Sequence, residues 1–179
     1  STCNEALLMQ YLLGKTEDRK KRAVLINYFL EQFRTTLYRQ TMFAEFELEI
    51  HRLAEAGESL TAARLCEIYY GLNQLYYGEN VVHDEEIAVE WARIPHFYRR
   101  FYVYQYATGF SAAMALSKRI LEGGPAAVED YLQFLSGGCS TDPLSLLRTA
   151  GVDLGTPKPV EDALALFEQL TGEMEELLS

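Results

Sequence analysis

The amino-acid sequence predicts an all-α protein, and three observations support that fold class. Apolar residues recur every three to four positions along nearly the whole chain, which is the period of an amphipathic helix. No alternation of apolar and polar residues, the pattern of a half-buried strand, extends beyond the ambiguous stretch 102–106. Glycine and proline stand at intervals that fit the ends of helices. Because there is no repeat, low-complexity tract or linker, we expect residues 1–179 to form one all-helical unit.

The N-terminal part predicts two helices. A first helix over 2–14 carries a leucine-rich apolar stripe, and Thr16-Glu17-Asp18 can cap the next helix. Residues 17–56 contain neither glycine nor proline and continue the apolar stripe, so they predict one long helix. A straight helix of that length would extend ~60 Å, so we expect a bend near Thr35-Thr36 or Thr41.

The remaining elements follow from the same signals. A third helix is expected over 60–76, and 79–95 forms a connection with a short helical turn. The aromatic segment 95–109 is expected to be a loop. The C-terminal helices then occupy 110–177, and Gly123-Gly124 ends the first of them before a proline that starts the next.

The composition excludes several classes of function. Sixteen Lys and Arg against 26 Asp and Glu give a net charge of -10, which disfavours nucleic acids and anionic membranes as partners. No apolar run approaches the roughly 20 residues of a membrane span. The three cysteines, Cys3, Cys66 and Cys139, are far apart and odd in number, so neither a disulfide framework nor a cysteine zinc site is indicated. A reducing cytoplasm fits this usage best.

The chain taken alone holds no complete catalytic set. Its histidines, His51, His83 and His96, include no pair spaced four residues apart, so there is no H-E-x-x-H zinc helix. A glycine-rich phosphate loop and a nucleophile elbow are also missing. We expect His51 to lie on a helix surface and His83 in a loop.

One segment nevertheless concentrates hydrogen-bond donors before the flexible Gly109. These donors are His96, Tyr98, Tyr102, Tyr104 and Tyr106. Phenol hydroxyls stay protonated at neutral pH and donate hydrogen bonds, which suits a developing oxyanion or the carbonyls of a bound peptide. The same residues also fit an aromatic core plug, in which the rings pack inside and the hydroxyls reach the surface.

Two further positions carry charge worth explaining. Glu5 lies in the first turn of the first helix, where the helix dipole favours an acid. It could also orient a metal-bound histidine without touching the metal. Arg39, in mid-helix among apolar residues, needs an acidic partner, either Glu45 or a residue elsewhere, and we interpret its surroundings as structural.

Three motifs resemble a known family. They are Ser-Thr-x-Asn-Glu at 1–5, Arg-Gln-Thr-Met-Phe-Ala-Glu-Phe-Glu at 39–47, and Pro-His-Phe-Tyr-x-x-Phe-Tyr-Val-Tyr-Gln-Tyr-Ala-Thr-Gly at 95–109. In this order they resemble the C-terminal part of the oligoendopeptidase F enzymes, which belong to the thimet/neurolysin-like zinc metallopeptidases. The resemblance covers essentially the whole chain, and the third motif is the most specific.

The resemblance implies a nearly all-helical catalytic domain with a deep channel for short peptides. Its zinc is held by the histidines of H-E-x-x-H and by a glutamate expected just upstream of Ser1, so no metal ligand is expected in this chain. Glu5 matches a second glutamate that supports the site without binding zinc. His96 matches a loop histidine, and Tyr102 and Tyr106 match tyrosines that stabilise the oxyanion or hold the substrate. Tyr98 and Tyr104 remain possible substitutes.

The chain is therefore expected to be the C-terminal portion of a cytoplasmic zinc metalloendopeptidase that hydrolyses oligopeptides. It begins without a methionine and already in a helical pattern. It should supply the substrate-binding wall and the histidine and tyrosine donors, and it should be inactive and zinc-free without the missing N-terminal part. The apolar stripe of its first helix favours self-association. The alternative is a non-catalytic helical module that binds a peptide or a partner helix.

Overall fold

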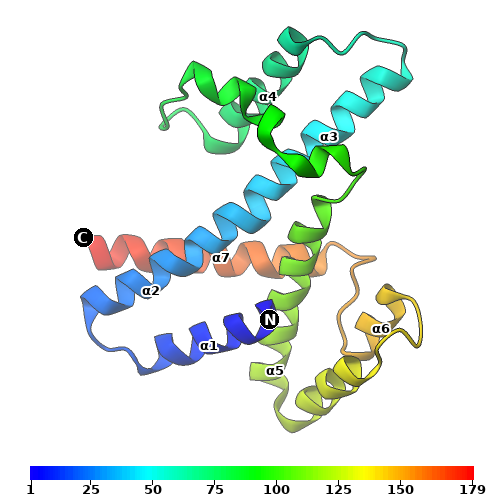
Figure 1. The fold of residues 1–179 in the computed structure, drawn as a ribbon. Helices are drawn as coiled ribbons and strands as arrows, with labels where there is room; N and C mark the ends of the chain where they lie inside the picture. The colour runs from blue at the N-terminus through cyan, green and yellow to red at the C-terminus, as the bar shows by residue number, and fades with distance from the viewer. The chain divides into compact units, whose positions relative to one another are not determined.

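The computed structural model describes all 179 residues, and every regular element in it is a helix (Figure 1). The all-α fold class is therefore confirmed. No helix is both long and apolar enough to cross a membrane.

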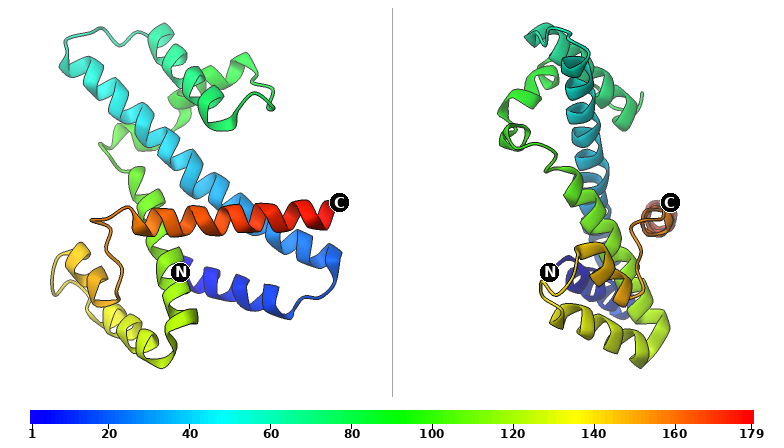
Figure 2. Two further views of the ribbon diagram at one scale, coloured as in Figure 1. Left: turned by 180° about the vertical axis from the view of Figure 1, so that it is seen from behind. Right: turned by 90° about the vertical axis from the view of Figure 1, so that its right-hand side faces the viewer.

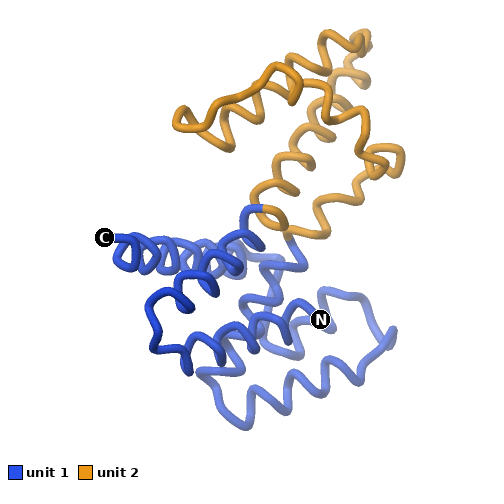
Figure 3. Tube along the Cα trace, turned by 60° about the vertical axis from the view of Figure 1, so that its left-hand side comes forward, with its two compact units in different colours: residues 1–34, 108–179 blue, residues 35–107 orange.

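The chain divides into two compact units (Figure 3). Unit 1 comprises residues 1–34 and 108–179, and unit 2 comprises residues 35–107. The sequence predicts a single unit. It does not indicate the division because the chain passes from one unit to the other inside helices and not in loops. One crossing lies within the π-helix η1 (Phe33–Tyr38) and the other within α5 (Tyr104–Ser136), so no change in composition marks either of them.

Unit 1 is built around α1 (Thr2–Lys15), α2 (Arg19–Gln32) and α7 (Lys158–Leu178). Both α1 and α7 pack against α2, and α7 runs across α2 in the left view of Figure 2. Fully buried Phe33 lies at the centre of an aromatic cluster. Its ring centroid is 4.9 Å from that of Phe110 and 5.5 Å from that of Phe167. Burying large aromatic rings is the main source of stability for such a helix packing.

Two helices of unit 1 begin at a capping aspartate. The Asp18 carboxylate accepts a hydrogen bond from the backbone N–H of Lys21 at 2.8 Å, which starts α2. The Asp142 carboxylate caps the short α6 (Pro143–Thr149) in the same way. Within α5 the helix breaks at Gly124, whose φ of 63° and ψ of −151° are not helical. A second helical stretch then begins at Pro125, as the sequence predicts.

Unit 2 contains α3 (Arg39–Glu55), α4 (Ala62–Tyr77) and two 3₁₀ helices, η2 (Glu85–Arg93) and η3 (Pro95–Tyr98). Helix α4 packs against both α3 and η2. The core of unit 2 is a cluster of buried residues contributed by α3, α4 and the segment that follows η2: Met42, Phe43, Phe46, Tyr69, Ile94 and Val103.

The structure differs from the sequence-based expectation in two elements. The predicted helix 17–56 consists of α2, η1 and α3, and the π-helix η1 falls at the expected bend near Thr35-Thr36. The predicted loop 95–109 is shorter, since η3 forms its start and α5 begins already at Tyr104. Gly109 accordingly has a helical conformation, and an added Cβ atom would contact nothing within 4 Å.

Candidate active site

The segment between η3 and α5 is anchored by the short helix η3 at one end and by a buried residue, Val103, at the other. Pro95 occupies the first turn of η3 and places His96 on it. Val103, just before α5, is fully buried in the core of unit 2. Between them, Phe101 adopts a φ of 52°, the left-handed conformation that side-chain-bearing residues rarely take. The chain therefore turns sharply between η3 and α5.

This turn brings together three of the predicted residues, His96, Tyr102 and Tyr106. The imidazole of His96 stacks on the Tyr102 ring, with centroids 5.5 Å apart and planes 25° from parallel. The Tyr106 hydroxyl lies 3.2 Å from Nε2 of His96. The two tyrosine rings meet edge to face at 5.6 Å. We call these three residues the His/Tyr cluster.

The phenol of Tyr106 is a proton donor at neutral pH, as an ordinary tyrosine is, and its surroundings strengthen that preference. Its pKa is raised above the ordinary value, first by partial burial and then by a hydrogen bond and charge interaction with Tyr102. The protonated hydroxyl can donate a hydrogen bond.

The His/Tyr cluster remains accessible. Tyr102 and Tyr106 are 40% and 38% exposed. A cavity of about 260 Å³ opens beside them, lined by Pro95, His96, Arg99 and Tyr102. The core of unit 2 is filled instead by residues such as Phe46 and Val103. This geometry favours the binding interpretation of the aromatic segment over the core plug.

The other predicted site residues lie outside this arrangement of three rings. Tyr98 is at the end of η3 and is 84% exposed. Tyr104 is in the first turn of α5 and is 49% exposed. Positions two apart on a helix point in different directions, so Tyr104 and Tyr106 do not share a face. Gly109 lies inside α5, and Glu5 is exposed in the first turn of α1, in unit 1.

Sequence reasoning missed Glu47, which is only 1% exposed in the middle of α3. Its Oε1 atom accepts a hydrogen bond from the backbone N–H of Phe101 at 2.6 Å. A signal was present in the sequence, because position 47 falls one helical turn after Phe43 and one before Ile50, on the apolar face of the helix. A buried acid on that face needs a hydrogen-bond donor, and here the donor is the backbone N–H of Phe101 in the turn between η3 and α5.

A second buried acid, Glu90 on η2, is the partner that Arg39 requires. The Arg39 guanidinium lies 2.5 Å from one carboxylate oxygen of Glu90, and the Tyr69 hydroxyl donates to the other at 2.6 Å. Arg93 pairs with the same carboxylate. Burial acts to raise the pKa of Glu90, but the hydrogen bonds and positive charges prevail and hold it below its usual value. Glu45, the other predicted partner, accepts instead from the Tyr76 hydroxyl.

The remaining histidines have structural contacts. A ring nitrogen of His83 lies 3.0 Å from the carbonyl oxygen of Gly78. The Nδ1 atom of His51 lies 2.7 Å from the carbonyl oxygen of Glu47, and the His51 ring is 4.7 Å from that of Phe101.

The residues of this chain do not fit a zinc ion. Zinc sites in proteins need at least three nitrogen, sulfur or oxygen ligands from side chains. No group of three or more His, Cys, Asp or Glu residues comes close enough together to hold a metal.

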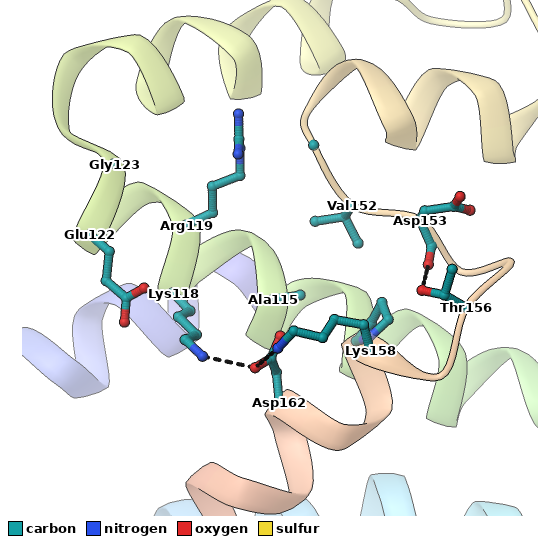
Figure 4. Close-up of a pocket in the computed structure, with 12 residues that line it drawn as sticks. Ala115, Lys118, Arg119, Glu122, Gly123, Val152, Asp153, Thr156, Lys158 and Asp162 are labelled. Carbon is teal, nitrogen blue, oxygen red and sulfur yellow. Dashed lines mark hydrogen bonds and ion pairs between the residues drawn. The ribbon is translucent and has the colours of Figure 1, made fainter.

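A larger cavity of about 520 Å³ lies in unit 1, between α5 and the start of α7 (Figure 4). Its cationic side chains already have acidic partners. Lys118 and Lys158 both contact Asp162, at 2.8 and 2.6 Å, and Arg119 pairs with Asp130. Each of these cationic side chains is thus paired within the protein, and Lys118 and Lys158 share one carboxylate.

Comparison with known proteins places the chain among peptidases. It is 54% identical over 178 residues to the oligopeptidase PepF of Bacillus subtilis, and 43% identical to the chromosomal oligoendopeptidase F of Lactococcus lactis subsp. cremoris. Both alignments cover 99% of this chain but only 27% and 30% of those proteins. The crystal structure of oligoendopeptidase-F from Enterococcus faecium superimposes with a TM-score of 0.96 at 48% identity, over 99% of this chain and 34% of that one.

The chain thus spans about a third or less of the length of these relatives. Its sequence also matches the profile of peptidase family M3 over residues 1–166. With nearly the whole chain covered by that match, the protein belongs to peptidase family M3.

Proposed function

We propose that this chain forms the substrate-binding wall of an oligoendopeptidase F-type metalloendopeptidase that hydrolyses short oligopeptides. The observation that carries the proposal is the His/Tyr cluster, in which one imidazole and two phenols converge at an accessible turn. Membership of family M3 and the names of the relatives support the reaction class.

In this proposal the side chains of the His/Tyr cluster act as proton-bearing donors toward the substrate. Attack of water on a peptide carbonyl places negative charge on its oxygen, and preoriented donors stabilise that charge. The Tyr106 hydroxyl is suited to this role because a tyrosine with the ordinary pKa of about 10 is protonated at neutral pH, and here the pKa is raised further. His96 and Tyr102 orient it and can donate in turn. Tyr98, Tyr104 and Gly109 are proposed as substrate contacts that flank the cluster.

We further propose that zinc and the general base come from residues of the enzyme outside this chain. Family M3 is generally zinc-dependent, whereas the side chains present here form no three-ligand group. Glu5 is proposed to orient a zinc ligand without binding the metal. The three free cysteines support a cytoplasmic location.

The test is made in the full-length enzyme that carries this chain. Tyr106→Phe removes one donor and should lower kcat by about 10²- to 10³-fold while leaving KM within a few-fold, because the donor acts mainly on the transition state. His96→Ala should behave similarly. Tyr70→Phe is the matched control, since the Tyr70 hydroxyl bonds to the carbonyl oxygen of His83 and not to the cluster. Unchanged turnover in the His96 and Tyr106 variants would remove these residues from the reaction.

A further inference from the structure

The buried acid Glu47 has no role in the proposed chemistry, yet it contacts the turn that carries the His/Tyr cluster. Its side chain is 1% exposed, and its carboxylate accepts the Phe101 backbone N–H at 2.6 Å. The two residues are 54 positions apart in the sequence. A short hydrogen bond to a buried carboxylate is a strong restraint on the backbone that donates it.

The restrained residue is the one whose backbone most needs support. Phe101 is the sole non-glycine residue with a positive φ, at 52°. A bulky residue keeps that conformation only when its surroundings enforce it. Two contacts from α3 do so here. The Glu47 carboxylate holds the Phe101 amide, and the His51 ring lies 4.7 Å from the Phe101 ring.

Tyr102 is therefore fixed from both sides along the chain. Phe101 precedes it and is tied to α3, whereas Val103 follows it and is fully buried in the core of unit 2. With both neighbours held, the Tyr102 side chain is directed onto the imidazole of His96 at 5.5 Å and toward the Tyr106 ring at 5.6 Å.

We propose that Glu47 is a positioning residue: its carboxylate holds Phe101 in the left-handed conformation and thereby sets the Tyr102 ring against His96 and Tyr106. The effect on catalysis rests on the proposed function of the His/Tyr cluster, but the effect on geometry does not. Glu47 acts only through the Phe101 amide and has no contact with the reacting atoms.

The chemistry of the hydrogen bond selects the variants. The side-chain carbonyl of Gln can accept the Phe101 N–H and has the same size as Glu, so Glu47→Gln should preserve the turn. Leu has no hydrogen-bond acceptor, so Glu47→Leu should free the Phe101 backbone N–H and loosen the turn. Glu45→Leu is the matched control, because Glu45 lies on the same helix and accepts a hydrogen bond from the Tyr76 hydroxyl instead.

The geometric test uses NMR on the 179-residue chain. In the unaltered chain the stacked Tyr102 ring should shift the His96 imidazole protons upfield, and the Phe101 amide should exchange slowly with solvent. Glu47→Leu should move the imidazole signals toward their unstacked positions and speed exchange of the Phe101 amide by about tenfold or more. Glu47→Gln and Glu45→Leu should leave both signals in place.

Two results would overturn the positioning role. One is a folded Glu47→Leu chain whose His96 signals and Phe101 exchange rate match those of the unaltered chain. If that variant does not fold, the unaltered chain decides the matter. A Phe101 amide that exchanges at the rate of an open loop contradicts the proposal, and a protected amide together with an unchanged Glu47→Gln spectrum supports it.

Kinetics in the full-length enzyme connects this geometry to catalysis. Glu47→Leu should lower kcat by ~10²-fold, the usual cost of displacing a catalytic group by about 1 Å, with KM changed little. Glu47→Gln should restore turnover. If Glu47→Leu alters the NMR signals but not kcat, the positioning role stands and the function proposed for the His/Tyr cluster fails.

Discussion

At the scale of single residues, two buried acids of unit 2, Glu47 and Glu90, form hydrogen bonds that tie distant segments of the unit together. The carboxylate of Glu90 forms ion pairs with Arg39 and Arg93 and accepts a hydrogen bond from the Tyr69 hydroxyl, so its negative charge is fully compensated. Such a group is costly to alter, because removing one member leaves the others buried without a partner. The pKa of Tyr69 is raised, first by burial and then by its bond to Glu90, which keeps its hydroxyl a donor.

The lowered pKa of Glu90 implies that the free energy of unfolding depends on pH. That pKa lies below its ordinary value of 4.5, so ionised Glu90 stabilises the fold above that pH. The stabilisation is lost as the pH falls from 4.5 through the lower pKa of the folded state. Glu90→Gln should reduce the free energy of unfolding by about 2 kcal/mol near neutral pH, and the deficit should shrink as the pH falls below 4.5.

Denaturant unfolding of the chain, followed by circular dichroism across this pH range, checks the expectation. Glu67→Gln is the control, since Glu67 forms only an exposed pair with Arg64 and such pairs contribute about 0–1 kcal/mol. A Glu90→Gln deficit that does not change with pH would show that the charge of Glu90 is not what stabilises the fold.

The proximity of the three rings could be predicted because they are near in sequence, whereas their role in a reaction stays a prediction. His96, Tyr102 and Tyr106 lie within one short segment, and the structure brings them together. The partners of Arg39 and Phe101 were not predictable, because Glu90 and Glu47 lie 51 and 54 positions away. Only the packing of α3 against the rest of unit 2 selects them.

At the scale of elements, glycine has opposite effects at two points of α5. At Gly124 the φ of 63° and ψ of −151° belong to a region that is essentially restricted to glycine, and the helix breaks there before Pro125. At Gly109 the backbone is helical and an added Cβ atom would meet nothing within 4 Å. Glycine is therefore required at the first position and only costs backbone entropy at the second.

The two glycines provide a paired prediction. Gly124→Ala should lower the free energy of unfolding by about 1–3 kcal/mol. Gly109→Ala should raise it by roughly 0.5–1 kcal/mol, because alanine is the better helix former. Thermal unfolding of the two variants beside the unaltered chain measures both effects. A stabilising Gly124→Ala would contradict the break in α5, and a strongly destabilising Gly109→Ala would contradict an open position.

Helices and their ends were predicted well because capping and breaking are local. Asp18, which lies in the predicted cap, accepts a backbone N–H at the start of α2. Thr61 and Asp142 cap α4 and α6 in the same local way. The start of α5 was not predicted, since the alternation over 102–106 fits a strand, a loop or a helix equally well. Burial of Val103 in the core, a tertiary contact, accompanies the start of the helix at Tyr104.

At the scale of the whole molecule, the chain brings histidine and tyrosine side chains together at one accessible turn but holds no group of three metal-binding side chains. Its net charge is negative, and the two lysines of the cavity between α5 and α7 share Asp162. The relatives are more than twice as long, since this chain covers 27–34% of them. If the reaction is that of a zinc peptidase, binding of substrate and activation of water must then be divided between this chain and other residues.

That division predicts how the 179-residue chain behaves by itself. Without a three-ligand group it should retain less than stoichiometric zinc after dialysis, and it should not cleave a fluorogenic oligopeptide. The His/Tyr cluster can still contact a peptide, so weak binding without hydrolysis is expected, and Tyr106→Phe should weaken it only slightly because the donor acts mainly on the transition state. Metal analysis, the peptidase assay and peptide titration measure the three quantities. Stoichiometric zinc or sustained hydrolysis would show that the metal and the general base are assembled from this chain's own residues.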